Sequence, residues 1–558
     1  MSRSISGIEE PAPARRLSRF SAAPSAVLRH HPRLTPLVLV VVVSALYALV
    51  RPPLYERDGF AYQLLGRYFL ADTNPHHLLW NGVQSLVLRF DAALGIHSVL
   101  PFQWLGMAST AAAIGGLYLL LAKISGRHTL ALAIGFFVSV SPWVWFMAFQ
   151  NQPYALMFLL FVAFVAAFAT PDGAMPRGRR FVGAAAAAVG MVVLQQAAVL
   201  IVIAAAVCFV ALSGVKRALA WAAATGVPTA VLYMGFAGAM GVRSMHGFLD
   251  WTTSYLRSQH ALQVRFPESL VQSVMGIVSA FVNQEPLKDR IVEWAPRDIL
   301  LLYSIIGIAM CAAVLIAVRL ERRAAARGEW RPLVWICVAS IVSWGIFCFV
   351  WEPTNYYWFI LLVPAFALAI PKARPAKTGA RAWMVVLAIT IAWNVYANRY
   401  VDAQGTERAP EPQLRVLEAR TTERDLLWVL DVGWSEDVDY DLLAAATSIE
   451  HSVPIRSFAD VAGRSPDAAA FARAIVDSTA TVAARGGRAF VSGRVFERDS
   501  YARRWEESPF ADYREEREFP IDWRALSLQL PRLLAQRFTV RPAGFVIGTD
   551  TVLALTPR

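Results

Sequence analysis

Two acidic residues placed just after a long apolar run are the first residues in this chain whose position indicates chemistry. Glu56 and Asp58 lie a few residues beyond the apolar segment 34–50. A carboxylate at a membrane face is energetically unfavourable, so its presence indicates a function. One such function is to act as a general base toward a hydroxyl group. The structural alternative is that Asp58 caps the following helix while Glu56 pairs with Arg57. The sequence leaves both interpretations open.

Two adjacent histidines begin a second stretch of amphipathic sequence, 77–93. Side chains at neighbouring positions diverge on a helix, so His76 and His77 fit a polar helix start or a substrate contact better than a metal site. We therefore expect the histidines to contact substrate. We expect no metal ion and no cofactor.

Polar residues also interrupt the apolar sequence at two turns, 150–154 and 351–358. The first turn contains Gln152 and Tyr154, and the second contains Glu352, Asn355 and Tyr356. An interfacial aromatic belt with a proline turn accounts for the tryptophans and tyrosines. It does not account for the concentration of amides and a carboxylate, so a substrate-binding site remains the alternative.

The composition places these residues in a membrane protein. Of the 558 residues, 56% are hydrophobic and only 17% are charged, whereas soluble domains carry about 25% charged residues. This excludes a soluble enzyme, a disordered chain and a fibrous protein. The net charge of +12 does not indicate a nucleic-acid partner, because the tail from Asp402 holds 20 Arg, no Lys and 25 acidic residues. The positive excess therefore belongs to the loops that flank apolar segments.

Eleven apolar segments are predicted to be membrane spans. They are 34–50, 99–122, 129–148, 154–170, 181–194, 197–212, 218–238, 299–318, 333–350, 357–370 and 382–397. Gln195 and Gln196 divide one continuous run into the fifth and sixth spans. With this division every cytoplasmic loop is basic, and the short outer connections at 150–152, 195–196 and 351–355 contain no Lys or Arg. Merging the two spans would invert all later loops. Eleven spans place the N-terminus inside and the C-terminus outside.

This topology divides the chain into three parts. Residues 1–33 form a basic cytoplasmic tail, followed by an uncleaved signal anchor. Residues 34–400 form the transmembrane part with outer loops 51–98 and 239–298, and the first loop is predicted to hold interfacial helices at 59–70 and 77–93. Residues 401–558 form a soluble α/β domain. In it, 425–431 and 488–496 are predicted strands, 468–484 a helix, and 537–547 with 551–556 a hairpin.

The order of these features resembles that of the GT-C membrane glycosyltransferases, which include protein O-mannosyltransferases and the aminoarabinose transferases of lipid A. The shared order is one span, an outer loop with an acid and a tyrosine-containing helix, a histidine and leucine element, a polar Pro-Tyr turn after the third span and an outer C-terminal domain. It covers about residues 34–400. The resemblance implies Asp58 as the catalytic base, Glu56 as the second choice and Tyr62 as a substrate contact.

The resemblance also implies a fold class and a reaction. The fold is a polytopic α-helical membrane protein, GT-C-like, with about eleven transmembrane helices and a C-terminal soluble α/β domain. The reaction is the inverting transfer of a sugar from a polyprenyl-phosphate carrier to a glycan, lipid or protein acceptor. Cations or hydrogen-bond donors stabilise such a phosphate leaving group. The residues on the required side are Arg243, His246, Arg257 and Tyr356.

We expect the enzyme in the bacterial inner membrane, among membrane lipids, with its C-terminal domain in the periplasm. The alternative is a transporter or flippase of lipid-linked glycans. Transporters usually contain repeated halves and charged or broken helices at mid-membrane. The sequence contains no visible repeat, and its candidate polar residues gather at one membrane face, which favours the enzyme.

Overall fold

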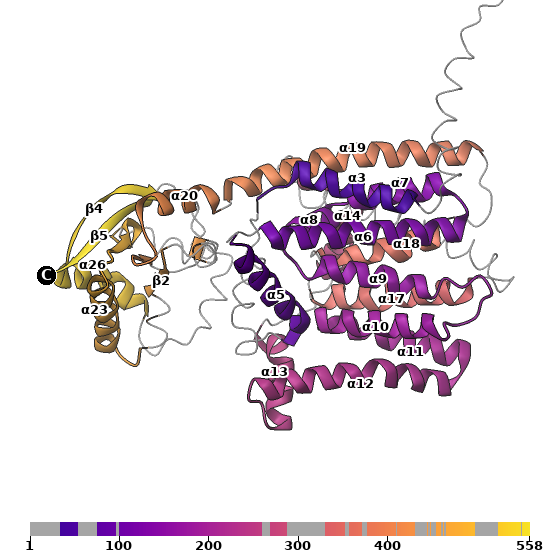
Figure 1. Ribbon diagram of the computed structural model, residues 1–558, viewed down its shortest axis with the longest axis horizontal. Coiled ribbons are helices and arrows are strands. Elements are labelled where there is room, and N and C mark those ends of the chain that lie inside the picture. Colours follow the sequence, from indigo (N-terminus) through magenta and orange to yellow (C-terminus); the bar gives the residue numbers. More distant parts are fainter. Residues whose placement is uncertain are drawn as a thin grey trace, which may run out of the picture.

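The computed structural model is mostly helical, with a small sheet near the C-terminus (Figure 1). The described residues are 34–53, 75–95, 100–258, 268–286, 330–351, 356–370, 377–408, 410–429, 443–444, 447, 453–458, 461, 465–496, 523–547 and 550–558. Five predicted site residues lie outside them, namely Glu56, Asp58, Tyr62, Glu352 and Asn355.

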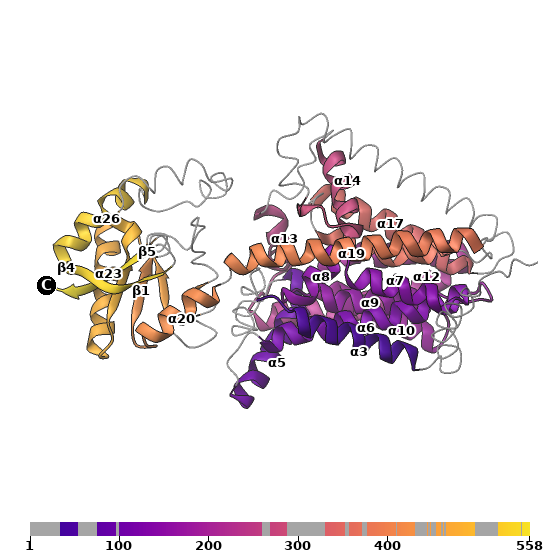
Figure 2. The same cartoon turned by 90° about the horizontal axis from the view of Figure 1, so that it is seen from above.

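Helices lying side by side form the apolar part of the chain (Figures 1 and 2). Their bounds are α3 Thr35–Val50, α6 Leu100–Ser125, α7 His128–Ser139, α8 Pro142–Phe149, α9 Tyr154–Ala167, α10 Arg179–Leu194, α11 Val199–Ser213, α12 Val215–Ala239, α14 Glu268–Phe281, α17 Arg331–Trp351, α18 Leu362–Ala369 and α19 Lys377–Arg408. Among the described residues, α6, α12, α17 and the segment Gln196–Ser213 are long and apolar enough to cross a membrane. The bent pair of α7 and α8 is a fifth candidate. The protein is therefore a multi-pass membrane protein.

Helices occupy ten of the eleven predicted spans, and the eighth, 299–318, lies outside the described residues. Several of these helices, such as α9, are too short to cross about 30 Å of hydrocarbon at about 1.5 Å per residue. The count of eleven spans therefore stays a prediction. The division at the glutamine pair is confirmed, because α10 ends at Leu194 and Gln195 has an extended backbone with φ −148° and ψ 109°.

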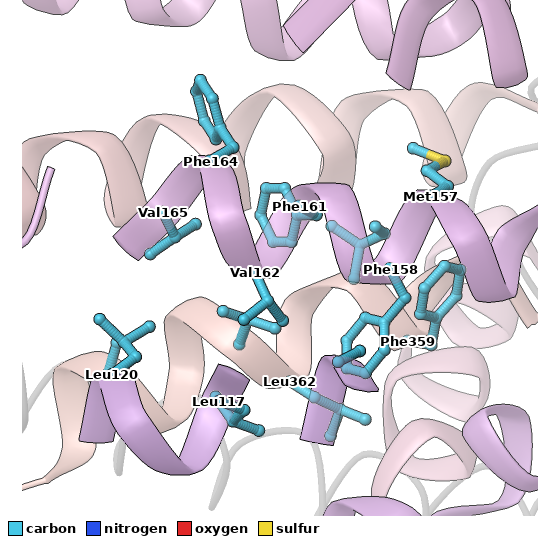
Figure 3. Close-up of a cluster of buried hydrophobic side chains, with 14 of the residues drawn as sticks. Leu117, Leu120, Met157, Phe158, Phe161, Val162, Phe164, Val165, Phe359 and Leu362 are labelled. Carbon is cyan, nitrogen blue, oxygen red and sulfur yellow. The ribbon is translucent and has the colours of Figure 1, made fainter. Parts of the chain in front are cut away.

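Buried aromatic and aliphatic side chains fill the centre of the bundle (Figure 3). Residues of α9 contact residues of α6, of α18 and of the 3-10 turn η3 (Tyr356–Leu361). The rings of Phe158 and Phe359 meet edge to face with centroids 5.5 Å apart, and both residues are buried. Helix α12 instead exposes Val227 and Val231. A helix that is apolar on all sides belongs in the interior, and an apolar exposed face suits contact with lipid.

The chain bends by 61° between α7 and α8, and side chains satisfy the carbonyl groups that this bend releases. The Tyr47 hydroxyl of α3 donates to the Ser139 carbonyl at 2.7 Å. The Asn398 amide of α19 donates to the Val140 carbonyl at 2.9 Å. Lipid cannot hydrogen-bond free backbone groups, so a broken membrane helix needs such caps.

Helix α19 carries polar residues at intervals of four, which places them on one face. Asn394 Oδ1 accepts from the Asn283 backbone N–H at 3.0 Å, and Asn398 Oδ1 accepts from Asn283 Nδ2 at 2.8 Å. Asp402 accepts from the Trp145 indole N–H of α8 at 3.0 Å. These bonds hold α19 against the segment after α14 and against α8. From the bundle, α19 continues toward the C-terminal sheet (Figure 2).

The C-terminal sheet has the strand order β2-β1-β3-β5-β4. Strands β1 (Leu426–Val429), β2 (Ile455–Ser457) and β3 (Ala489–Ser492) are parallel, and β4 (Phe538–Ile547) with β5 (Asp550–Pro557) completes the sheet as an antiparallel hairpin. The accompanying helices are α20 Glu411–Arg420, α23 Ala468–Ala484 and α26 Trp523–Arg537. The predicted helix and hairpin are confirmed, and β1 and β3 lie within the two predicted strands. The end of the predicted strand 488–496 is instead the 3-10 turn η4 (Gly493–Phe496). Strand β2 and helices α20 and α26 have no counterpart among the predictions.

Buried Asp425 connects the beginnings of β1 and β3. Its carboxylate accepts from the Arg488 backbone N–H at 2.6 Å, from Arg488 Nη2 at 2.8 Å and from the Thr422 backbone N–H at 2.9 Å. Burial alone raises the pKa of this carboxyl, but the hydrogen bonds from Arg488 and Thr422 and the charge of Arg488 outweigh it. The pKa of Asp425 therefore lies below its ordinary value.

Candidate active site

One end of the bundle, the end nearest the C-terminal sheet, carries α5 (Leu78–Leu94) and α13 (Met245–Ser258) at an angle to the other helices (Figures 1 and 2). Helix α5 buries Asn81 and Gln84 completely while Leu86 and Phe90 are 66% and 56% exposed. The polar face thus points into the protein and the apolar face points outward, as expected of a helix at a membrane interface. The predicted helix at 77–93 is confirmed.

The short 3-10 turn η1 (Pro75–His77) leads into α5 and is held by the end of α10. The His77 Nδ1 atom lies 2.9 Å from the Leu194 carbonyl oxygen. A carbonyl only accepts, so Nδ1 carries the proton. The Tyr233 hydroxyl of α12 lies 3.0 Å from the Pro75 carbonyl oxygen and 3.3 Å from that of Val192. The turn η1 is therefore held in place by hydrogen bonds to carbonyl groups at the end of α10, directly from His77 to Leu194 and through the Tyr233 hydroxyl to Val192.

Both histidines are neutral at physiological pH. Burial lowers the pKa of His77 to about 4, against the opposing effect of its bond to Leu194. Burial, with the charge of neighbouring His77 as the smaller cause, lowers the pKa of His76 to about 4 as well. Neutral imidazoles cannot neutralise a phosphate group, so these side chains suit hydrogen bonding and packing.

Tyr154, the first residue of α9, lies at the centre of this end of the bundle. Its ring meets His77 edge to face at 5.9 Å and Tyr356 of η3 at 5.1 Å, measured between ring centroids. Its hydroxyl donates to the Tyr357 hydroxyl at 3.2 Å and accepts from Gln195 Nε2 at 3.5 Å. The structure thus brings together predicted residues from the first outer loop, the 150–154 turn and the segment after α17.

The Trp351 indole provides a second contact between the same segments, because its ring lies 6.4 Å from that of His76. Trp351 at the end of α17 therefore meets the first outer loop, whereas the ring of Tyr356 meets that of Tyr154 of α9. The distances from this turn to Asp58 involve residues outside the described part of the chain.

Amide side chains of α5 form a part of this site that the sequence analysis did not identify. The Gln84 and Asn151 amides form two reciprocal hydrogen bonds, at 3.1 and 3.2 Å. Asn151 has a positive φ of 52°, which asparagine tolerates better than most residues. Asn81 lies one turn before Gln84 and shares its face of α5. In the sequence this face can be recognised because Asn81, Gln84 and Ser85 lie on one side of the helix and Leu79 and Leu86 on the opposite side.

We call this set of side chains the polar junction. It consists of His76, His77, Trp80, Asn81, Gln84, Asn151, Gln152, Tyr154, Gln195, Tyr356 and Tyr357. Six of its buried polar atoms have no hydrogen-bond partner among the described residues: Trp80 Nε1, both amide atoms of Asn81, both amide atoms of Gln152, and Gln195 Oε1. A buried polar atom left unpaired costs roughly 1–3 kcal/mol, so this concentration is the arrangement expected where water or a ligand supplies the missing partners.

Three predicted phosphate ligands lie at the same end of the bundle but outside the polar junction. Arg243 is exposed in the connection from α12 to α13, and His246 is exposed in the first turn of α13, where its Nε2 lies 3.1 Å from an Asp250 carboxylate oxygen. Arg257 lies in α13. Among the described residues, no group of three His, Cys, Asp or Glu side chains could hold a metal ion.

No protein-family model matches the chain, and no curated protein matches it. Among solved structures, the chain is similar to ArnT from Cupriavidus metallidurans bound to undecaprenyl phosphate, with a TM-score of 0.51 and 12% identity over 93% of this chain and 97% of that one. It is also similar to the archaeal oligosaccharyltransferase AglB from Archaeoglobus fulgidus in complex with an inhibitory peptide and a dolichol-phosphate, with a TM-score of 0.47 and 11% identity over 95% and 75% of the two chains.

The likeness to ArnT over nearly the whole chain shows a GT-C-like fold, which confirms the resemblance found in the sequence. At 12% identity the likeness concerns the fold alone.

Proposed function

We propose that this protein is an inverting glycosyltransferase that moves a sugar from a polyprenyl-phosphate carrier to an acceptor hydroxyl outside the bacterial inner membrane. The observation that carries the proposal is the set of unpaired amide atoms at the polar junction of a GT-C-like fold. A transporter requires polar groups along a path through mid-membrane. Every described unpaired amide atom instead belongs to one end of the bundle, which favours an enzyme working at a membrane face.

In this proposal Asp58 is the general base. Its carboxylate takes the proton from the acceptor hydroxyl while the hydroxyl oxygen attacks the anomeric carbon of the sugar. The bond from that carbon to the phosphate oxygen breaks, the electron pair leaves with the polyprenyl phosphate, and the anomeric configuration inverts. Glu56 is the alternative base.

The remaining predicted residues serve the two substrates. Arg243, His246 and Arg257 supply positive charge or donors to the leaving phosphate. The sugar and the acceptor are held by Tyr62, His76, Gln152, Tyr154, Glu352, Asn355 and Tyr356. His77 acts differently, because its Nδ1–H bond to Leu194 makes it a positioning residue for the break between α10 and α11.

The test uses purified protein reconstituted into vesicles with undecaprenyl-phosphate sugars and a mixture of envelope acceptors. The measurement is the release of undecaprenyl phosphate. Asp58→Asn should reduce release by roughly 10²–10⁴-fold, the usual contribution of a general base, and the matched variant Glu56→Gln should retain it. Loss in Glu56→Gln alone would make Glu56 the base.

Two further results would overturn parts of the proposal. Near-normal release by both variants would refute catalysis by either acid. Movement of the lipid-linked sugar between leaflets by the wild-type protein, without release of undecaprenyl phosphate, would establish the transporter alternative.

A further inference from the structure

The unpaired amides at the polar junction carry an inference about which sugar this site accepts. Asn81 and Gln152 are each 0% exposed, and both amide atoms of each lack a partner among the described residues. An amide presents one acceptor and two donors in a plane. Adjacent hydroxyl groups on a sugar ring also donate and accept, so an unpaired amide is a complementary receptor for two neighbouring hydroxyls.

The Gln84–Asn151 pair explains why these two amides belong to one site. Its two bonds join α5 to the turn between α8 and α9. Asn81 precedes Gln84 by one helical turn, and Gln152 follows Asn151 directly. The satisfied pair thus fixes the backbone of α5 one turn from Asn81 and the backbone of the turn that carries Gln152. Pre-organisation of this kind lowers the entropy that a bound ligand would otherwise lose by ordering the site.

The charge of the site sets the class of sugar. Every side chain of the polar junction is uncharged at neutral pH, since its polar groups are amides, phenols, one indole and two neutral imidazoles. An ammonium or carboxylate group of a sugar placed against Asn81 and Gln152 would lose its hydration without gaining a counter-charge from the polar junction. An uncharged hexose or pentose loses only hydroxyl hydration, which the amides replace.

We propose that Asn81 and Gln152 form a subsite that binds the hydroxyl groups of an uncharged sugar unit, with the Gln84–Asn151 pair as its positioning element. The proposal rests on the proposed function, because the sugar is the one carried by the polyprenyl phosphate. It adds the specificity of the site and Asn81 as a further residue that contacts substrate.

The test measures binding of three lipids to the full chain in nanodiscs, by native mass spectrometry. The probes are undecaprenyl phosphate, undecaprenyl-phosphate mannose as the uncharged sugar and undecaprenyl-phosphate aminoarabinose as the cationic sugar. The wild-type protein should bind the mannose lipid more tightly than the other two. Tighter binding of the aminoarabinose lipid would overturn the proposal without any variant being made.

The variants Asn81→Leu and Gln152→Met remove the amides at similar volume. Each should weaken binding of the mannose lipid roughly tenfold, the effect of about one hydrogen bond, and should leave undecaprenyl phosphate binding unchanged. Thr110→Val is the matched control, because Thr110 of α6 is also buried with an unpaired side-chain oxygen among the described residues. It should change neither affinity.

Other outcomes distinguish a failure of the subsite from a failure of the proposed function. Unchanged mannose-lipid binding in both amide variants would overturn the subsite and leave fixed water as the partner of these atoms. Failure of the wild-type protein to bind any of the three lipids would instead refute the polyprenyl-phosphate carrier of the proposed function. Should one variant fail to fold, Gln152→Glu tests the same point, because its added charge should shift preference toward the aminoarabinose lipid.

Discussion

Replacing His77 by asparagine should remove most of the pH dependence that this imidazole gives to the free energy of unfolding. The substitution should keep the hydrogen bond to the Leu194 carbonyl. The His77 side chain is 7% exposed and donates from Nδ1 to the Leu194 carbonyl. An asparagine amide can place a donor close to the position of Nδ1, but it does not titrate between pH 4 and pH 8. The variant therefore isolates the protonation of this imidazole from the bond that holds η1 to the end of α10.

The magnitude follows from the two pKa values. In the folded protein the pKa of His77 is about 4, against 6.5 for an ordinary histidine. As the pH falls, the unfolded chain takes up the proton first, so folding is weakened below pH 6.5 and the loss is complete below the folded pKa. At pH 5 these values correspond to a loss of roughly 2 kcal/mol, and at pH 7.5 the loss is negligible.

The assay is unfolding in mixed micelles at increasing SDS, followed by tryptophan fluorescence at pH 7.5 and pH 5. Other titrating groups contribute equally to both proteins, so the quantity compared is the difference in unfolding free energy between the two pH values. It should be about 2 kcal/mol smaller for His77→Asn than for the wild-type protein. Equal pH dependence in both proteins would show that His77 is not held neutral by burial, and the reasoning about η1 would fail.

Two further predictions concern the C-terminal sheet and the orientation of the chain. Asp425→Asn should destabilise the sheet by about 2 kcal/mol, because the buried carboxylate accepts four hydrogen bonds, while its partner Arg488 is 59% exposed and part of the charge interaction is screened. Faster proteolysis of residues 421–558 would show this, and an unchanged rate would contradict it. Ala480→Cys, on the exposed face of α23, should react with a membrane-impermeant maleimide in intact spheroplasts. Asp172→Cys, in the exposed turn after α9, should react only after the membrane is permeabilised. Reaction of both cysteines from the same side would refute the predicted topology.

The sequence predicted the features that depend on hydrophobic length and charge asymmetry. The break at Gln195 is an example, because the distribution of basic loops required it and α10 does end at Leu194. The strand at β1, the helix α23 and the hairpin of β4 and β5 also follow from local periodicity. Strand β2 has only three residues and α26 contains Pro531, so neither gives a clear local signal.

The sequence could not show which face of α5 is inside. A helix at a membrane interface and a helix on a soluble protein have the same amphipathic pattern, and only the surrounding solvent decides which side is buried. In this protein the polar side of α5 packs against the bundle, so Asn81 and Gln84 are buried. The pairing of Gln84 with Asn151 joins positions 67 residues apart, and no local pattern predicts such a contact.

The bundle buries polar side chains at the bend between α7 and α8 and at the polar junction, and the two regions differ in whether these side chains have hydrogen-bond partners. At the bend between α7 and α8, Tyr47, Asn398 and Asp402 each have a hydrogen-bond partner. At the polar junction, Asn81 and Gln152 have none among the described residues. The unpaired hydroxyls of Thr110 and Ser340 are single groups that can turn toward a carbonyl of their own helix. An amide holds one acceptor oxygen and two donor hydrogens, so a single neighbouring carbonyl cannot satisfy it. Because the chain pairs its amides where only structure is at stake, the unpaired amides identify the place where something other than the protein completes the site.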